Sequence, residues 1–210
     1  MKKTILIIPA VIMLAACHGG DISKAIYKNP DAPVEKRVAD LLSRMTLEEK
    51  ILQLNQGVCG RDDNVNNIGY NPNKDPRVGS VICGKSKDNS KIIREFQQKA
   101  IDSTRLGIPI LVGYDVIHGE KTTFPIPLAQ GASFNPSLAE QSCRVSALEA
   151  YEEGIDWTFS PMIDICHDPR WGRVMESYGE DPYVNSVFCV GAVRGYQGDD
   201  LSTPGNIAAC

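Results

Sequence analysis

Apolar runs of strand length alternate with helical patterns along most of the chain, and this alternation constrains the fold more than any other feature. The strand-like runs cover residues 78–83, 108–114, 155–163 and 206–210. Helical patterns lie between them, over residues 91–105, 136–153 and 182–197. Strands that alternate with helices form a parallel sheet with right-handed crossovers. We therefore predict an α/β fold.

The number of these units indicates a barrel. Two helical patterns, one after Pro33 and one after Thr46, precede the first strand, and residues 57–76 are expected to form a loop. The fourth strand reaches the last residue, and four βα units are about half of a (β/α)8 barrel. We therefore expect residues 34–210 to form the N-terminal half of a TIM-type barrel that is truncated in its fourth strand. The alternative is a complete doubly wound sheet of about four or five strands.

The first 17 residues have the features of an export signal. Lys2 and Lys3 precede an apolar run that is too short to span a membrane. The run ends in Leu-Ala-Ala-Cys, which resembles a bacterial lipoprotein signal and implies that Cys17 carries lipid. An ordinary secretory signal is the alternative. We predict an exported protein, periplasmic or anchored to the outer membrane through Cys17, with residues 18–33 as a tether.

Charge and cysteine content exclude some partners. The net charge is -4, and nucleic-acid binding needs clustered positive charge, so we expect no nucleic-acid partner. The cysteines after Cys17 show no Cys-x-x-Cys motif and no dense spacing, and the sequence has no histidine cluster, so we expect no zinc or other metal site. Three of them lie in apolar segments and are expected to be buried thiols, with few or no disulfides in the chain: Cys83, Cys143 and Cys189.

Long polar loops follow two of the predicted strands, at the edge where α/β proteins place ligand sites. In the first loop (residues 115–125), Asp115 directly follows the strand. An ionised Asp accepts charge-assisted hydrogen bonds from sugar hydroxyls, although Asp115 is also suited to capping local backbone amides. His118 stands beside a glycine, as histidines that hydrogen-bond within loops often do.

The second loop (residues 164–181) carries Asp164, Asp168, Arg170, Trp171, Arg173, Glu176, Glu180 and Asp181. Arg173 offers a fork of donors to a hydroxylated ligand, or alternatively pairs with Glu176 or Glu180. Trp171 is suited to stacking on a sugar face or to closing the top of the core. Asp181 is expected to cap the next helix.

Five motifs in this region follow one another in a known order. They are Gly-Ile-Pro-Ile-Leu-Val-Gly-Tyr-Asp-Val-Ile-His-Gly at 107–119, Thr-Phe-Pro-Ile-Pro-Leu at 123–128, Trp-Thr-Phe-Ser-Pro-Met-Ile-Asp-Ile at 157–165, Asp-Pro-Arg-Trp-Gly-Arg at 168–173 and Gly-Glu-Asp-Pro-Tyr at 179–183. Together they resemble glycoside hydrolase family 3, and most closely its periplasmic β-glucosidase branch. The resemblance covers nearly all of the chain after residue 33.

This resemblance implies a (β/α)8 barrel followed by an α/β sandwich domain, no cofactor, and retaining hydrolysis of β-glycosides from the non-reducing end. The substrate would be a β-linked oligosaccharide or glucoside. Asp115 matches the aspartate that holds hydroxyls of the terminal sugar, and Arg173 matches the arginine of a Gly-Arg-x-x-Glu motif. His118, Trp171 and Glu176 are expected to support these two residues.

The resemblance also implies that the catalytic residues lie elsewhere. The family's Lys-His pair follows Ala-Ala-Cys, its nucleophilic Asp lies on a later strand, and its acid/base usually comes from the next domain. We therefore expect no catalytic residue before Cys210 and no activity from these 210 residues alone. Alternatives are a non-catalytic glycan-binding lipoprotein and a broken gene product. Glucosidase, xylosidase and N-acetylglucosaminidase specificities are not separated by these residues.

Overall fold

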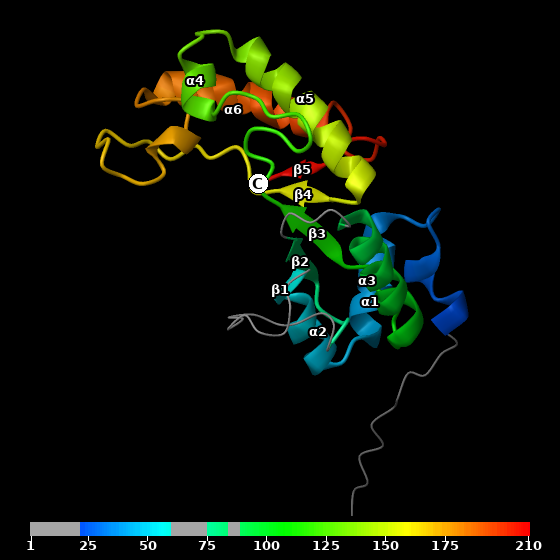
Figure 1. Ribbon diagram of the computed structural model, residues 1–210. Coiled ribbons are helices and arrows are strands. Elements are labelled where there is room, and N and C mark those ends of the chain that lie inside the picture. The colour runs from blue at the N-terminus through cyan, green and yellow to red at the C-terminus, as the bar shows by residue number, and fades with distance from the viewer. Residues whose placement is uncertain (1–21, 60–74, 84–88) are drawn as a thin grey trace, which may run out of the picture. The chain divides into compact units, whose positions relative to one another are not determined.

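The computed structural model describes residues 22–59, 75–83 and 89–210, and it divides into two compact units (Figure 1). The first unit ends at Thr46, and the second runs from Leu47 to Cys210. The expected export signal and Cys17 lie outside the described residues.

The first unit is a helix with a short folded segment against it. Its elements are η1 (Ile22–Lys24), η2 (Ile26–Lys28) and α1 (Val34–Arg44). The buried Tyr27 donates its backbone N–H to Asp40 Oδ2 at 3.1 Å and accepts a 3.1 Å hydrogen bond from Arg37 Nε at its carbonyl. The described part of the expected tether is therefore folded against α1.

The second unit is built on a parallel sheet whose strands follow one another in chain order, as in a barrel. The strands are β1 (Gln56–Cys59), β2 (Ser80–Cys83), β3 (Leu111–Tyr114), β4 (Trp157–Thr158) and β5 (Ala208–Ala209). Every neighbouring pair is parallel. The predicted α/β class and parallel sheet are confirmed.

The prediction of a loop over residues 57–76 is wrong at its start, because β1 occupies Gln56–Cys59. The strand has one β-branched residue and a glycine, which is too weak a pattern to predict a strand by itself. Its register with β2, in which Val58 lies opposite Ile82, supplies the pairing that the sequence pattern does not. The last strand is therefore the fifth of the described sheet and not the fourth.

Two predicted strands are shortened by proline. The run over residues 108–114 forms a strand only from Leu111, and the run over 155–163 only at Trp157–Thr158. Pro109 and Pro161 have no N–H to donate, so a ladder of strand hydrogen bonds does not continue through them.

The helices of the second unit are α2 (Leu47–Gln53), α3 (Asn89–Ser103), α4 (Pro127–Gly131), α5 (Pro136–Glu153) and α6 (Pro182–Gln197), with η3 (Val174–Glu176) in the second loop. The bounds of α5 and α6 are those predicted. Asn135 and Asp181 cap them by accepting the N–H of Ser137 and of Val184. Gly154 ends α5 with a φ of 89°. The short α4 was not predicted.

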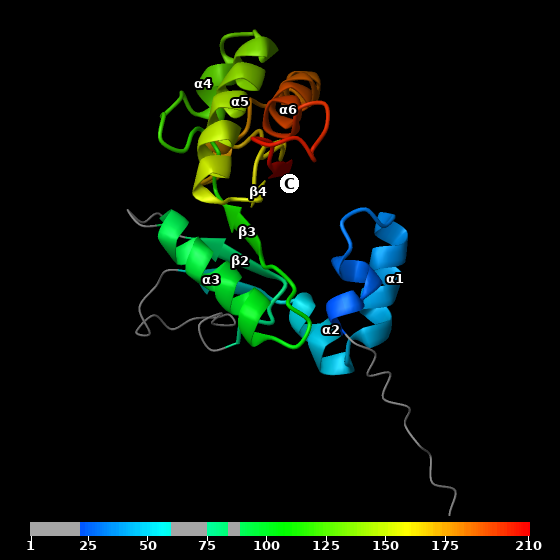
Figure 2. The same cartoon turned by 90° about the vertical axis from the view of Figure 1, so that its right-hand side faces the viewer.

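The core lies between the sheet and its helices, and α5 and α6 pack side by side (Figures 1 and 2). The helices approach closely because glycines face α5. A Cβ on Gly195 would lie 2.3 Å from the Glu140 carbonyl oxygen, and one on Gly191 would lie 2.8 Å from the Pro136 carbonyl oxygen. Of the thiols expected to be buried, Cys83 and Cys143 are buried and Cys189 is half-buried.

Candidate functional site

The first polar loop begins directly after β3, and the second follows β4 after residues 159–163, so both leave the sheet at the edge where these two parallel strands end. Tyr114 of β3 lies opposite Thr158 of β4, and Asp115 is the next residue after β3. This is the edge at which parallel α/β folds place ligands.

Asp115 lies within the electrostatic influence of the charged pair of the second loop, Arg173 and Glu176. Its carboxylate is exposed to solvent and accepts no hydrogen bond from the described residues, so the amide-capping alternative is not observed there. Partial burial raises the pKa of Asp115, and the negative charge of Glu176 raises it further, while the positive charge of Arg173 lowers it. The fold therefore brings three of the predicted site residues together.

Arg173, the residue before η3, forms a salt bridge with Glu176, the last residue of η3. Arg173 Nε and Nη2 both donate to Glu176 Oε2, at 2.9 and 2.7 Å. This hydrogen bonding raises the pKa of Arg173, and the charges of Asp164 and Asp115 add to the effect. The alternative in which Arg173 pairs with Glu176 is thus observed. The Nη1 group of Arg173 makes no hydrogen bond to a described residue, so a donor remains for a ligand.

His118 acts within the first loop. Its Nδ1 lies 3.1 Å from the Phe124 carbonyl oxygen, and its own carbonyl accepts the Phe124 N–H at 2.8 Å. These bonds close the loop on itself. His118 is therefore placed as a loop-stabilising residue, as the sequence alternative had it.

Trp171 and the remaining charges are arranged locally in the second loop. The Trp171 side chain is half-buried. Its backbone N–H donates to the Asp168 carbonyl oxygen at 3.1 Å. Arg170 pairs with Asp168 at 2.6 Å, which lowers the pKa of Asp168. Among the described residues, no ring contact joins Trp171 to another aromatic side chain.

A buried hydroxyl network, which the sequence did not predict, lies directly behind Asp115. Val116 donates its N–H to Thr158 Oγ1 at 3.1 Å, and its carbonyl accepts from the Tyr196 hydroxyl at 2.5 Å. The same hydroxyl lies 3.2 Å from Ser160 Oγ. Thr158 and Ser160 sit inside an apolar run that indicates only a strand, so no pattern in the sequence marks them.

Asn185, also not predicted, holds the end of the second loop. Its side chain accepts the Tyr178 N–H at 3.1 Å and donates to the carbonyls of Gly179 and Asp181, at 2.6 and 3.1 Å. Asn185 is 2% exposed, so these bonds are formed away from water. The loop is thereby fixed to the first turn of α6.

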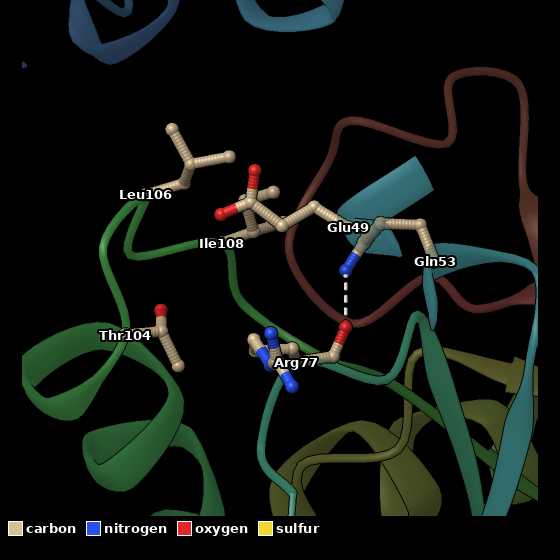
Figure 3. Close-up of a pocket in the computed structure, with 6 residues that line it drawn as sticks. All are labelled: Glu49, Gln53, Arg77, Thr104, Leu106 and Ile108. Carbon is tan, nitrogen blue, oxygen red and sulfur yellow. Dashed lines mark hydrogen bonds between the residues drawn. The ribbon is translucent and has the colours of Figure 1, made fainter. Parts of the chain in front are cut away.

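Two cavities are lined by residues other than Asp115, Arg173 and Glu176. A small one of about 10 Å³ lies near the amino ends of the strands and is lined by Glu49, Gln53, Arg77, Thr104, Leu106 and Ile108 (Figure 3). There Gln53 Nε2 donates to the Arg77 carbonyl at 2.8 Å. A groove of about 410 Å³ lies between α4 and α5 and includes Phe124, Gln130 and Val145.

Within residues 22–59, 75–83 and 89–210, no three His, Cys, Asp or Glu side chains are grouped as metal ligands would be. No helix in the same part of the chain is long and apolar enough to cross a membrane.

The sequence profile of a domain described as "Glycosyl hydrolase family 3 N terminal domain" matches residues 46–206. The chain belongs to glycosyl hydrolase family 3. The resemblance found in its motifs is therefore confirmed, and with it the barrel type of fold, because this parallel sheet is part of the family's TIM-like N-terminal domain.

Two relatives and one solved structure illustrate the family 3 match. The chain is 40% identical over 161 residues to the "Periplasmic beta-glucosidase" of Salmonella typhimurium, which covers 77% of this chain and 20% of that protein. It is 32% identical over 190 residues to a "Putative beta-xylosidase" of Formosa agariphila, covering 82% of this chain and 25% of that protein.

The solved structure is the β-glucosidase of Listeria innocua in complex with glucose. It superposes with a TM-score of 0.74 at 40% identity, over 84% of this chain and 26% of that chain. The family 3 chain described here thus spans about a fifth to a quarter of the length of these relatives.

Proposed function

We propose that this protein is an exo-acting β-glycosidase of the β-glucosidase type, which releases the terminal sugar from the non-reducing end with retention of configuration. Its substrate would be a β-glucoside or a β-linked oligosaccharide. The observation that carries this proposal is the family 3 match together with a carboxylate, Asp115, that accepts no hydrogen bond from the described residues at the carboxyl end of β3.

In this proposal Asp115 accepts hydrogen bonds from hydroxyls of the terminal sugar. A carboxylate offers two oxygens, and charge-assisted bonds are about twice as strong as neutral ones. Arg173 donates to another oxygen of the same sugar from its Nη1 group, while Glu176 holds the other two nitrogens of the guanidinium. His118 and Trp171 support these residues by shaping the two loops.

Retention requires two further groups. A carboxylate nucleophile attacks the anomeric carbon while an acid protonates the leaving oxygen, and water then releases the sugar from the covalent intermediate. We propose that neither group lies among residues 22–210, following the family pattern of a nucleophile on a later strand and an acid/base in the next domain. These 210 residues would by themselves bind sugar without hydrolysing it.

We further propose that the protein is exported and held at a membrane surface by lipid on Cys17. The Leu-Ala-Ala-Cys motif supports the lipid, and the name of the Salmonella relative supports export.

The test is hydrolysis of nitrophenyl glycosides by the protein that the complete gene encodes. The β-glucoside is expected to be the best substrate, ahead of the β-xyloside, the N-acetyl-β-glucosaminide and the α-glucoside, and proton NMR should show β-glucose before mutarotation. First release of α-glucose would contradict retention. The absence of turnover on all β-glycosides, with glucose still bound, would favour a non-catalytic glycan-binding role.

A further inference from the structure

The backbone immediately after Asp115 is held by two side chains from other elements. The N–H of Val116 donates a hydrogen bond to the hydroxyl oxygen of Thr158 in β4, and the carbonyl of Val116 accepts one from the hydroxyl of Tyr196 in α6. All three residues are 0% exposed. Hydrogen bonds in such surroundings are not exchanged with water, so they fix geometry strongly.

This arrangement acts on Asp115 through the peptide plane. The N–H of Val116 belongs to the planar group that includes the carbonyl carbon of Asp115, so fixing that N–H fixes how the Asp115 backbone is turned. The Asp115 side chain has no hydrogen-bond partner of its own among the described residues. Its position before a ligand binds therefore depends on its backbone.

We propose that Tyr196 and Thr158 are positioning residues that set the Asp115 carboxylate in the orientation that receives sugar hydroxyls. The inference deepens the proposed function and rests on it. Neither hydroxyl reaches the sugar, since both are buried behind the sheet edge. Their effect on hydrolysis passes through Asp115 alone.

The phenol of Tyr196 is well suited to this role because one hydroxyl serves both loops. It donates to Val116 at the start of the first loop and lies 3.2 Å from Ser160, just after β4. The ring is part of the buried core beside α5. Tyr196→Phe therefore removes the hydrogen bond while keeping the ring that fills the space.

A double-mutant cycle tests the proposal in the protein that the complete gene encodes, with 4-nitrophenyl β-glucoside as the substrate. Tyr196→Phe is expected to lower kcat/KM by roughly tenfold or more, because small displacements of binding groups are costly. In an Asp115→Ala background the same substitution should change kcat/KM by less than about twofold, because coupled residues do not add. A purely structural role would lower activity by the same factor in both backgrounds.

Matched variants separate the hydroxyls from general loss of stability. Thr158→Val should behave like Tyr196→Phe, and Thr158→Ser, which keeps the acceptor, should restore kcat/KM. Tyr178→Phe removes another buried phenol, one whose hydroxyl makes no hydrogen bond to a described residue, and should leave kcat/KM within about twofold. If Tyr196→Phe does not fold, the two Thr158 variants carry the same test.

The outcomes distinguish this inference from the proposed function. If the wild-type protein does not hydrolyse the glucoside, the proposed function fails and the inference fails with it. If the wild type is active and Asp115→Ala is impaired, but Tyr196→Phe reduces both backgrounds equally, only the inference is overturned. Strong coupling with Asp115, together with rescue by Thr158→Ser, supports it.

Discussion

Arg173 directs two of its nitrogens at a single oxygen of Glu176, at 2.9 and 2.7 Å, while Asp115 lies within the electrostatic reach of both. The salt bridge is only partly shielded, with the Arg173 side chain 57% exposed, so it contributes little to stability by itself. Its significance is positional, because it keeps a cation and an anion beside the carboxylate proposed to hold sugar.

Asp115→Ala should impair hydrolysis without unfolding the protein. A site built to bond a hydroxyl loses heavily when one partner is removed, so kcat/KM for an aryl β-glucoside should fall by about 10²-fold, or about 3 kcal/mol. The melting temperature should change little, since the carboxylate is exposed. Steady-state kinetics and thermal melting on the same preparation check both statements.

Asp115→Asn is the matched control. The pKa of Asp115 is raised by folding, so its ionised form costs stability above that pKa, and the cost disappears as the pH falls below the unfolded value. The amide lacks this charge, so the melting temperature of Asp115→Asn at neutral pH should equal or exceed that of the wild type. A clear drop in melting temperature with normal kcat/KM would point to a backbone-capping role instead.

Glu176→Gln should shift the acid limb of the pH profile to lower pH. Burial raises the pKa of Asp115 first, and the charge of Glu176 raises it further, so loss of that charge lowers it. Because the ionised carboxylate accepts the sugar hydroxyls, kcat/KM should be retained to a lower pH than in the wild type.

Glu180→Gln serves as the comparison for that profile. Glu180 is in the same loop but lies 3.8 Å from His167 and does not act on Asp115. Its profile should match that of the wild type. An acid limb that stays in place, or moves to higher pH, in Glu176→Gln would show that Glu176 does not influence Asp115.

Asn185→Ala should destabilise the fold by about 2–3 kcal/mol, because it leaves the buried Tyr178 N–H without its acceptor and the Gly179 carbonyl without its donor. Urea denaturation measures this change. The control is Asn135→Ala, since Asn135 is an exposed helix cap worth about 1 kcal/mol. Equal losses in the two variants would mean that the Asn185 bonds contribute no more than an ordinary cap.

Cys17→Ser should abolish lipid attachment. Labelled palmitate is expected to enter the wild-type protein in a bacterial host, because the thiol proposed to carry lipid is the cysteine that ends the Leu-Ala-Ala-Cys motif. Gel autoradiography of membrane fractions provides the measurement. Equal labelling of both proteins would remove the lipoprotein assignment and leave an ordinary secretory signal.

The sequence predicts most reliably the helices whose ends are marked by a capping residue and a glycine. Helices α5 and α6 have the predicted bounds because Asn135 and Asp181 cap them and a glycine follows each. Strand β1 could not be predicted in this way, since it is defined by its pairing with β2 and not by its own residues. The apolar run over residues 155–163 predicts a longer strand than β4, because it includes Pro161, which has no N–H for a strand hydrogen bond.

The same distinction applies to the candidate site. Asp115 could be proposed as a site residue because its position after an apolar run is visible in the sequence. The bonds behind it join residues 42 and 80 positions apart, so only the folded chain reveals Thr158 and Tyr196 as partners of Val116.

The glycines that let α5 and α6 touch have a consequence for any attempt to redesign specificity. Helix α6 begins where the second loop ends, and α4 lies between the first loop and α5. At Gly131 of α4 a Cβ would lie 2.0 Å from the Tyr178 carbonyl oxygen, so α4 is in backbone contact with the second loop. Swapping one loop for that of a relative would disturb the other. An exchange of specificity through these loops would therefore need to transplant both loops together with their helices.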